Sequence, residues 1–236
     1  MLSILAAGSA QAALIDRGGG LVYDTVLNVT WLQDANYAKT SGYDADGLMT
    51  WSAAKTWAEN LSYGGYNGWR LATNAPHGGW NYDYSYDGTT DRGWNITSTY
   101  SELSYMYYVN LELKGQVDVN GASRSDYGLF GNGTGNGVDE YSEGQNSVGL
   151  VNNLQSLGYW YDQHFEPGYA WGFSMKYGLQ DMLGGLNEEY YAWAVRNGDV
   201  AAVQQQDVPE PMSLALVCLG LAGVLLARRR RNLSAS

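Results

Sequence analysis

The last 29 residues limit most strongly what the rest of the chain can fold into. Residues 212–227 carry no charge, and four arginines follow them directly. Sixteen uncharged residues form a helix of about 24 Å at 1.5 Å per residue, which approaches the roughly 30 Å hydrocarbon core of a bilayer. A buried core helix fits poorly, because an arginine cluster at its end would be costly to bury. We therefore expect a transmembrane helix over 212–227, so the folded part of the chain precedes it.

Charge and the N-terminal residues predict on which side of the membrane that folded part lies. Basic residues flanking a transmembrane helix stay on the cytoplasmic side. The orienting residues here are Arg228, Arg229, Arg230 and Arg231. At the other end, Met1 to Ala12 is an apolar run that closes on Ala10-Gln11-Ala12, the small-x-small form of a signal-peptidase site. We expect a signal peptide over 1–12 and an exported domain over 13–207. Because the basic n-region is missing and the apolar run is short, the alternatives are a true start that lies upstream or a merely apolar terminus.

The residues before the apolar segment resemble a known sorting signal. Val208, Pro209, Glu210 and Pro211, a short apolar helix and an arginine cluster follow one another as in the PEP-CTERM signal of exopolysaccharide-producing Gram-negative bacteria. The resemblance covers 208–236 and implies an exosortase that recognises the Pro-Glu-Pro segment and cuts near it. Two prolines suit this role because they keep the backbone extended. The implied partners are the exosortase and cytoplasmic-membrane lipids, and the product is destined for the cell surface or extracellular matrix.

The exported part is acidic and contains few of the residues on which many active sites depend. Residues 1–207 hold nine basic and 23 acidic side chains, a net charge of −14. This charge argues against nucleic-acid binding, which needs Lys and Arg beside the phosphates. The one cysteine, Cys218, falls in the apolar segment, and His77 and His164 are the two histidines. Without a Gly-x-Ser-x-Gly elbow, nothing pairs either histidine with a nucleophile, so we expect a protein that is not an enzyme.

Hydrophobic periodicity predicts an α+β fold with two main helices and antiparallel strands. Thr50 can cap a helix that carries its apolar residues at helical spacing and ends at Gly64-Gly65. A second helix is expected after Thr99-Tyr100-Ser101-Glu102, which has the form of a capping box, through residue 111. Strands are expected over 21–23, 26–32, 159–161, 171–177 and 191–195, and a long loop region over 66–95. These elements indicate one domain.

Segments of this domain also resemble the domain that closes the Legionella collagen-like adhesin. The most specific are Trp69-Arg70-Leu71-Ala72-Thr73 and Trp193-Ala194-Val195-Arg196-Asn197-Gly198-Asp199, within a resemblance that spans roughly 16–200. The family's usual proline before Thr73 is Ala72 here, and the loop over 76–93 is longer and richer in tyrosine. The resemblance implies a C-type-lectin-like fold, the binding of sulfated polysaccharide in the named adhesin, and no catalytic residues.

Aromatic residues on the long loop suggest carbohydrate binding. Tyr and Trp present flat apolar faces with a polar edge, which match the C–H faces and hydroxyls of a pyranose ring. The candidate carbohydrate-binding residues are Trp80, Tyr82, Tyr84 and Tyr86, which would share one face of an extended segment. The alternative is that these rings pack on the domain, as we expect of the core tryptophans at 31, 51, 57, 69, 171 and 193.

The same loop carries candidate calcium ligands. Asp83, Asp87 and Asp91 offer the hard oxygen donors that calcium prefers, as do Asp118 and Asn120 in a later turn. Solvated turn residues are the alternative interpretation. Calcium could bridge the acidic surface to an anionic glycan, which the net charge would otherwise repel.

Three hypotheses for the function follow. The first is an exported, exosortase-sorted surface or matrix protein that binds or is embedded in exopolysaccharide. The second is a glycan-active enzyme, which needs two suitably spaced carboxylates. The third is a purely structural matrix component without a ligand.

Overall fold

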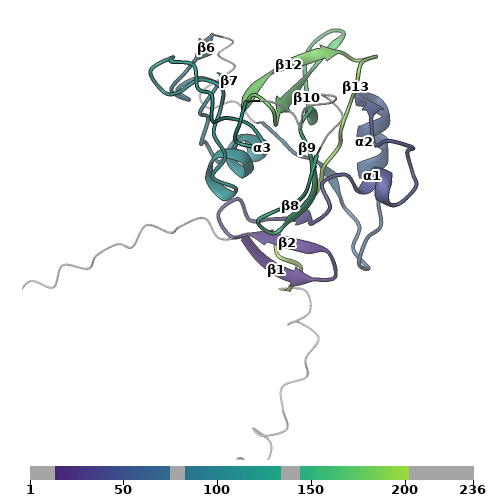
Figure 1. Cartoon of the computed structure of the whole chain (residues 1–236). Coiled ribbons are helices and arrows are strands. Elements are labelled where there is room, and N and C mark those ends of the chain that lie inside the picture. The colour runs from purple at the N-terminus through teal and green to yellow at the C-terminus, as the bar shows by residue number, and fades with distance from the viewer. Residues whose placement is uncertain (1–13, 75–82, 134–143, 202–236) are drawn as a thin grey trace, which may run out of the picture. The chain divides into compact units, whose positions relative to one another are not determined.

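Strands make up most of the regular structure in the computed structural model, which describes residues 14–74, 83–133 and 144–201 (Figure 1). The helices are α1 (Tyr37–Thr40), α2 (Trp51–Asn60) and α3 (Glu102–Tyr105), and α3 continues as a π-helical turn over Met106–Asn110. The strands are β1 (Leu14–Gly18), β2 (Leu21–Asp24), β3 (Val29–Leu32), β4 (Met49–Thr50), β5 (Arg70–Leu71), β6 (Tyr84–Ser85), β7 (Arg92–Gly93), β8 (Gly144–Val148), β9 (Val151–Gln155), β10 (Gly158–Glu166), β11 (Tyr169–Ser174), β12 (Leu179–Gly185), β13 (Glu189–Tyr190) and β14 (Ala194–Asn197). The predicted mixture of a few helices with many strands is confirmed.

The first sheet joins the two ends of the described domain. Its strand order is β1-β2-β3-β14-β5, and all neighbours are antiparallel. Val195 of β14 lies opposite Trp31 of β3, and the Trp31 and Trp193 ring centroids are 4.8 Å apart. The strand predicted over 26–32 begins only at Val29, because Asp24 accepts hydrogen bonds from the backbone of residues 26 and 27 and holds a turn there.

The second sheet carries the long aromatic loop. Its order is β10-β11-β12-β7-β6, antiparallel except for the parallel pair β6–β7. The strand predicted over 171–177 ends at Ser174, because Gly178, with φ +64°, donates its N–H to the Ser174 carbonyl and closes a hairpin turn. Both faces of β11 are buried from Ala170 to Ser174, so its alternating aromatics do not mark one solvent-facing side.

The helices confirm one predicted cap and correct another. The Thr50 side chain accepts a hydrogen bond from the Ala53 N–H, as expected of the N-cap of α2, although the helix ends at Asn60 rather than at the glycine pair. The capping box predicted over 99–102 is wrong. Ser101 is the N-cap of α3 and makes no side-chain cap bond, since the Glu102 carboxylate binds Arg70 and the Thr73 N–H instead.

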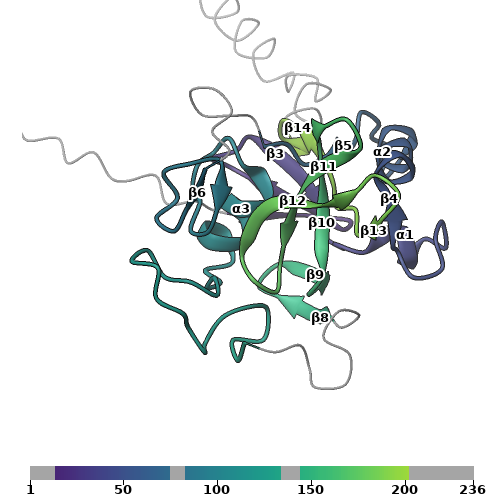
Figure 2. The ribbon, with the colours of Figure 1, turned by 90° about the horizontal axis from the view of Figure 1, so that it is seen from above.

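Most of the tryptophans expected in the core lie there. The rings at 31, 57, 69, 171 and 193 are at most 3% exposed, and Trp160 is also fully buried. Trp51 is partly exposed and lies against His164, with ring centroids 4.1 Å apart. The helices α1 and α2 lie on one side of β10 and β12, whereas α3 and the edge strand β6 lie on the other (Figures 1 and 2).

None of the helices in the described ranges is long and apolar enough to span a membrane. The helix predicted over 212–227 falls outside those ranges, as do the signal peptide and the sorting segment. The chain divides after Val200 into two units, and every helix and strand named above belongs to the first unit.

Candidate functional site

Three aromatic rings meet at the outer end of the second sheet. The Tyr86 ring stacks on Trp94 with centroids 5.6 Å apart and planes 25° apart, and Tyr84 lies 5.8 Å from the same Trp94 ring. Tyr84 is 45% exposed and Tyr86 is 49% exposed. We call these three residues the aromatic patch. It presents aromatic surface to solvent on a support that is itself packed against the domain.

Backbone contacts fix the two tyrosines beside Trp94. The strands β6 and β7 pair Tyr84 with Arg92 and Ser85 with Gly93, and the Trp94 N–H donates to the Ser85 carbonyl at 3.1 Å. The Asn95 side-chain amide donates to the carbonyls of Tyr86 and Val117, at 2.6 and 2.9 Å. Gly88 has φ +75° and lies so close to Asn95 that a Cβ would be 2.2 Å from the Asn95 carbonyl oxygen, so glycine is required at this turn.

A buried amide ties this loop to the sheet. Gln180 of β12 is fully buried, and its Nε2 donates to the Asp91 carbonyl at 2.8 Å and to the Ser101 hydroxyl at 3.1 Å. Its Oε1 accepts from the Tyr161 hydroxyl at 2.7 Å. Every polar atom of the Gln180 side chain is therefore engaged, and the base of the loop is held in one position.

A charged pair adjoins the aromatic patch. Arg92 donates from Nε to Asp181 at 2.6 Å, and its guanidinium carbon lies 4.2 Å from the centre of the Tyr84 ring. The Tyr84 hydroxyl also donates to Asp181. Burial raises the pKa of Asp181 to about 6, while its hydrogen bond from the Met182 N–H acts in the opposite direction. The aromatic patch and this charged pair together place ring faces beside a cation, a hydroxyl and a carboxyl.

A small pocket with both polar and apolar walls follows the patch along the chain. It has a volume of about 360 Å³ and is lined by residues 88–91 and 96–98. Thr89, Thr90, Thr97 and Ser98 supply hydroxyl groups to it, and Asp91 supplies a carboxyl. These groups can exchange hydrogen bonds with sugar hydroxyls.

The structure describes two of the four predicted aromatic residues. Tyr84 and Tyr86 come together as expected of neighbours on one face, whereas Trp80 and Tyr82 lie outside the described residues. Sequence reasoning missed Trp94, Arg92 and Asp181. Trp94 follows Arg92 at the two-residue spacing of a strand, and this spacing could have suggested that the two side chains lie on one face. Asp181 is 89 residues away from Arg92, so no local pattern linked the two residues.

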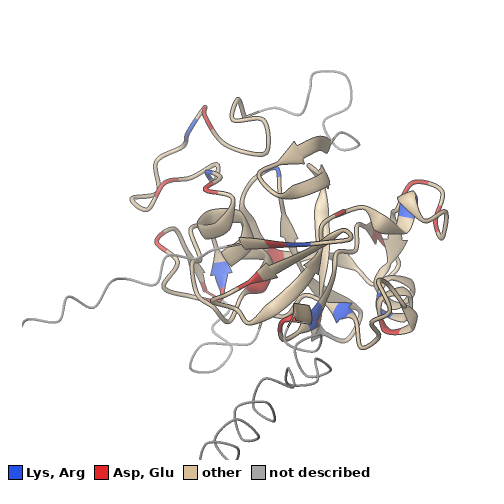
Figure 3. Cartoon of the chain, turned by 90° about the horizontal axis from the view of Figure 1, so that it is seen from below, with Lys and Arg blue, Asp and Glu red and all other residues tan. Residues whose placement is uncertain are grey.

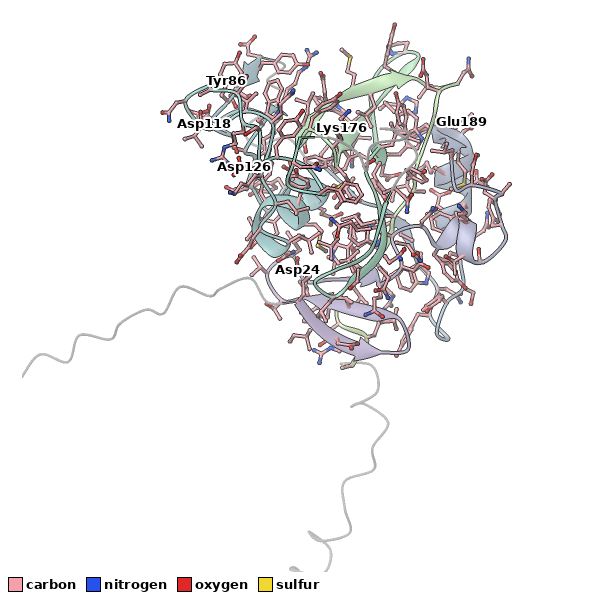
Figure 4. All side chains as sticks on the ribbon, viewed as in Figure 1. Asp24, Tyr86, Asp118, Asp126, Lys176 and Glu189 are labelled. Atoms are coloured by element: carbon pink, nitrogen blue, oxygen red, sulfur yellow. The ribbon has the colours of Figure 1, made fainter. Side chains whose placement is uncertain are left out.

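The candidate calcium ligands occupy turns. Asp87 accepts hydrogen bonds from the hydroxyl and the backbone N–H of Thr89, which lower the pKa of its carboxyl. Asp118 accepts from the N–H groups of Ala122 and Asn120, with the same effect on its pKa. Figure 4 shows Tyr86 and Asp118 close together at the outer edge. Within the described ranges, no three His, Cys, Asp or Glu side chains gather as a metal site, so calcium at Asp83, Asp87 or Asp91 would need amide or backbone oxygens as well.

Acidic residues are spread over several loops rather than gathered on one face (Figure 3). Several of the basic side chains are already engaged with carboxylates. The pairs among the described residues are Arg17–Asp199, Lys55–Glu59, Lys55–Asp162, Arg70–Glu102, Arg92–Asp181 and Lys114–Asp126. A ligand therefore meets a surface with few unpaired cations.

Comparison with known families identifies the end of the chain. Residues 207–231 match the PEP-CTERM protein-sorting motif, which confirms the resemblance of that segment. No curated protein and no solved structure matches the chain. The motif marks an exported, membrane-anchored precursor that an exosortase processes for sorting to the cell surface.

Proposed function

We propose that the exported part of this chain binds polysaccharide at the cell surface or in the extracellular matrix, without catalysing a reaction. The observation that carries the proposal is the aromatic patch. Tyr84 and Tyr86 are both about half exposed while they contact one supporting ring, Trp94. A platform of this kind offers a pyranose ring an apolar face that is already ordered, so binding costs little side-chain entropy.

The polar groups beside the rings suit the edge of a sugar. Arg92 and Asp181 supply a donor and an acceptor next to Tyr84, and the hydroxyl-lined pocket lies on the adjoining segments. Where no unpaired cation faces the ligand, the net charge of −14 of residues 1–207 favours neutral glycans over anionic ones. A sulfated or uronic-acid polymer would bind at this patch only with a bridging cation such as calcium.

The resemblance to the Legionella adhesin domain supports the same proposal. The resemblance implies a C-type-lectin-like fold, and the adhesin itself recognises a polysaccharide through that domain. Residues that carry the resemblance are central to the fold here: Arg70 pairs with Glu102, and Asn197 accepts from the Arg70 guanidinium at 2.6 Å. The sorting motif adds the location, because exosortase processing delivers the domain to the cell exterior.

A glycan array tests the proposal. The full chain in detergent should bind neutral polysaccharide, and a Tyr84→Ala, Tyr86→Ala variant should lose roughly tenfold or more in affinity, since stacked rings supply on the order of 1–2 kcal/mol. Arms with calcium and with a chelator report whether a cation takes part. Absence of binding to any neutral or acidic polysaccharide, with or without calcium, would contradict the proposal.

One observation favours the glycan-active enzyme as a second candidate. A carboxyl whose pKa is raised to about 6 by burial has the protonation behaviour of a general acid. Such an enzyme requires a second carboxylate about 5 to 10 Å away. Incubation of the full chain with polysaccharide, followed by assay of reducing ends, separates the candidates: hydrolysis abolished by Asp181→Asn supports the enzyme, and binding without hydrolysis supports the lectin-like function.

The structural matrix component without a ligand is the third candidate. A buried aromatic loop would favour it, whereas the half exposure of Tyr84 and Tyr86 favours a binding role. A chain that binds no glycan yet is retained in the extracellular matrix would support this third candidate.

A further inference from the structure

A second pocket lies away from the aromatic patch, between α1 and the β8–β9 hairpin. Its volume is about 470 Å³, within the range of pockets that hold small ligands. The side chains that line it are Asn36, Lys39, Thr40, Asn146, Asn153 and Gln155. Amides, a hydroxyl and an ammonium group therefore form its walls, and the described lining residues include no apolar side chain, aromatic ring or carboxylate.

This lining narrows the chemistry of a ligand. Apolar molecules would leave the amides unpaired, which is costly. A metal cation would find no carboxylate among the lining groups and would meet the Lys39 ammonium instead. Amides and hydroxyls both donate and accept hydrogen bonds. The hydroxyls of a polyhydroxylated molecule do the same, so such a molecule can pair with this lining.

Local hydrogen bonds fix the positions of two of the amide side chains, those of Asn153 and Gln155. Asn153 has φ +54°, a conformation seldom adopted outside glycine, and its Nδ2 donates to Asp34 Oδ2 at 2.9 Å. The Gln155 Nε2 donates to the Asn153 carbonyl at 2.7 Å. The Asn153 amide nitrogen bonds to Asp34, outside the hairpin, and the Gln155 nitrogen bonds within it. Each nitrogen keeps a second N–H, so both side chains can donate as well as accept. Sugar hydroxyls both donate and accept, so they can use all of these groups, whereas a sulfate ion at neutral pH can only accept.

The base and the rim of the pocket are also defined. Asn36 is 4% exposed, its N–H donates to Asp34 Oδ1 at 2.9 Å, and a Cβ at Gly47 would lie 1.9 Å from its Oδ1. Lys39 is exposed on α1 and has no carboxylate partner within the described part of the chain. An ammonium group at the rim of a pocket whose described lining residues carry no carboxylate favours an anionic substituent on the ligand.

We infer that this pocket binds a single carboxylated saccharide unit, a hexuronate, whose hydroxyls donate to Asn153 and Gln155 and whose carboxylate pairs with Lys39. This second site differs from the aromatic patch in its ligand: the patch offers ring faces for stacking, whereas the pocket offers hydrogen bonds and one cation. A chain with both sites could contact two kinds of unit in a mixed polysaccharide.

Titration of the full chain in detergent with trigalacturonate tests the inference, with maltotriose as the neutral probe. Lys39→Gln should weaken trigalacturonate binding roughly fivefold, and Gln155→Ala should weaken it by a similar factor, as expected for single hydrogen bonds. The matched control is Lys114→Gln, which removes an exposed lysine elsewhere and should leave the affinity unchanged. Because Lys39 lies on the surface, its variant should fold even if Gln155→Ala does not.

Three results would overturn the inference. They are failure of trigalacturonate to bind, binding that neither pocket variant weakens, and displacement of trigalacturonate by inorganic sulfate at equal concentration. A Tyr84→Ala, Tyr86→Ala variant that still binds trigalacturonate while losing neutral polysaccharide separates the pocket from the aromatic patch, so either site can fail without the other.

Discussion

Arg92 donates a hydrogen bond to Asp181 at 2.6 Å, and this pair joins β7 to β12 directly beside the aromatic patch. The Asp181 side chain is only 13% exposed, and its carboxyl also accepts from the Tyr84 hydroxyl. The ion pair therefore connects the sheet to a ring that we propose as part of the binding surface. A change in the charge of Asp181 should therefore affect the hydrogen bond and the position of the Tyr84 side chain.

Asp181 is expected to titrate with a pKa of about 6. In the unfolded chain its pKa should be near 3.9, so the folded state binds the proton more readily. A carboxyl with a raised pKa opposes folding above pH 6, and its contribution becomes more favourable as the pH falls from 6 towards 4. Carbon-detected NMR of the side-chain carboxyl measures the midpoint, with Asp181→Asn to assign the signal. A midpoint below 4 would mean that pairing with Arg92 outweighs burial.

Trp94 should be needed for the aromatic patch as a ring rather than as a hydrogen-bond donor. Its Nε1 is buried and has no hydrogen-bond partner among the described residues, so Trp94→Phe loses no bond there. Trp94→Ala removes the support under both tyrosines and should cost roughly 2 kcal/mol of stability and most of the glycan affinity. Thermal unfolding and glycan binding measured on both variants check this. Equal loss in the two variants would count against a stacking role.

The Arg70–Glu102 ion pair should contribute strongly to stability. Two guanidinium nitrogens donate to the carboxylate at 2.8 Å each, and the Glu102 side chain is 8% exposed. Glu102→Gln leaves a partly buried arginine without its counter-charge and should cost about 3 kcal/mol in denaturant unfolding. Lys114→Gln, which breaks a half-exposed pair with Asp126, should cost less than about 0.5 kcal/mol. Similar costs for both variants would show that burial does not strengthen the first pair.

Processing should depend on the proline residues of the sorting segment. In a host with its exosortase, mass spectrometry of the exported protein should find the chain without Arg228 to Arg231. Pro209→Ala with Pro211→Ala relaxes the extended backbone and should leave most of the protein uncut. Lys114→Gln serves as the control that is processed normally. Intact basic tails on protein outside the cell would contradict the assignment.

Local patterns predicted elements whose residues are neighbours in the sequence. The Thr50 cap and the strand over 21–23 are confirmed, because an N-cap bond and an alternating apolar run need few distant partners. Glu102 shows where this approach fails. Its spacing from Thr99 fits a capping box, but Arg70 offers a stronger, charged partner that only the folded chain brings within reach.

The candidate site was predicted in part for the same reason. Tyr84 and Tyr86 could be proposed as a pair because a two-residue spacing places side chains on one face of an extended segment. Their support by Trp94, and the polar partners Arg92 and Asp181, follow from the pairing of β6, β7 and β12. The amide-lined pocket gave no sequence signal, since its walls come from α1 and from a hairpin more than a hundred residues later.

The sequence by itself determined that this protein is sorted by a C-terminal signal, because that signal consists of consecutive residues read in an extended or membrane-inserted segment. It also determined the mixture of helices and strands through local periodicity. Only the tertiary structure decided which aromatic rings are buried, which carboxylates hold turns, and which polar groups face a pocket. Burial and pairing depend on contacts between distant segments, and a short-range pattern holds no information about those contacts.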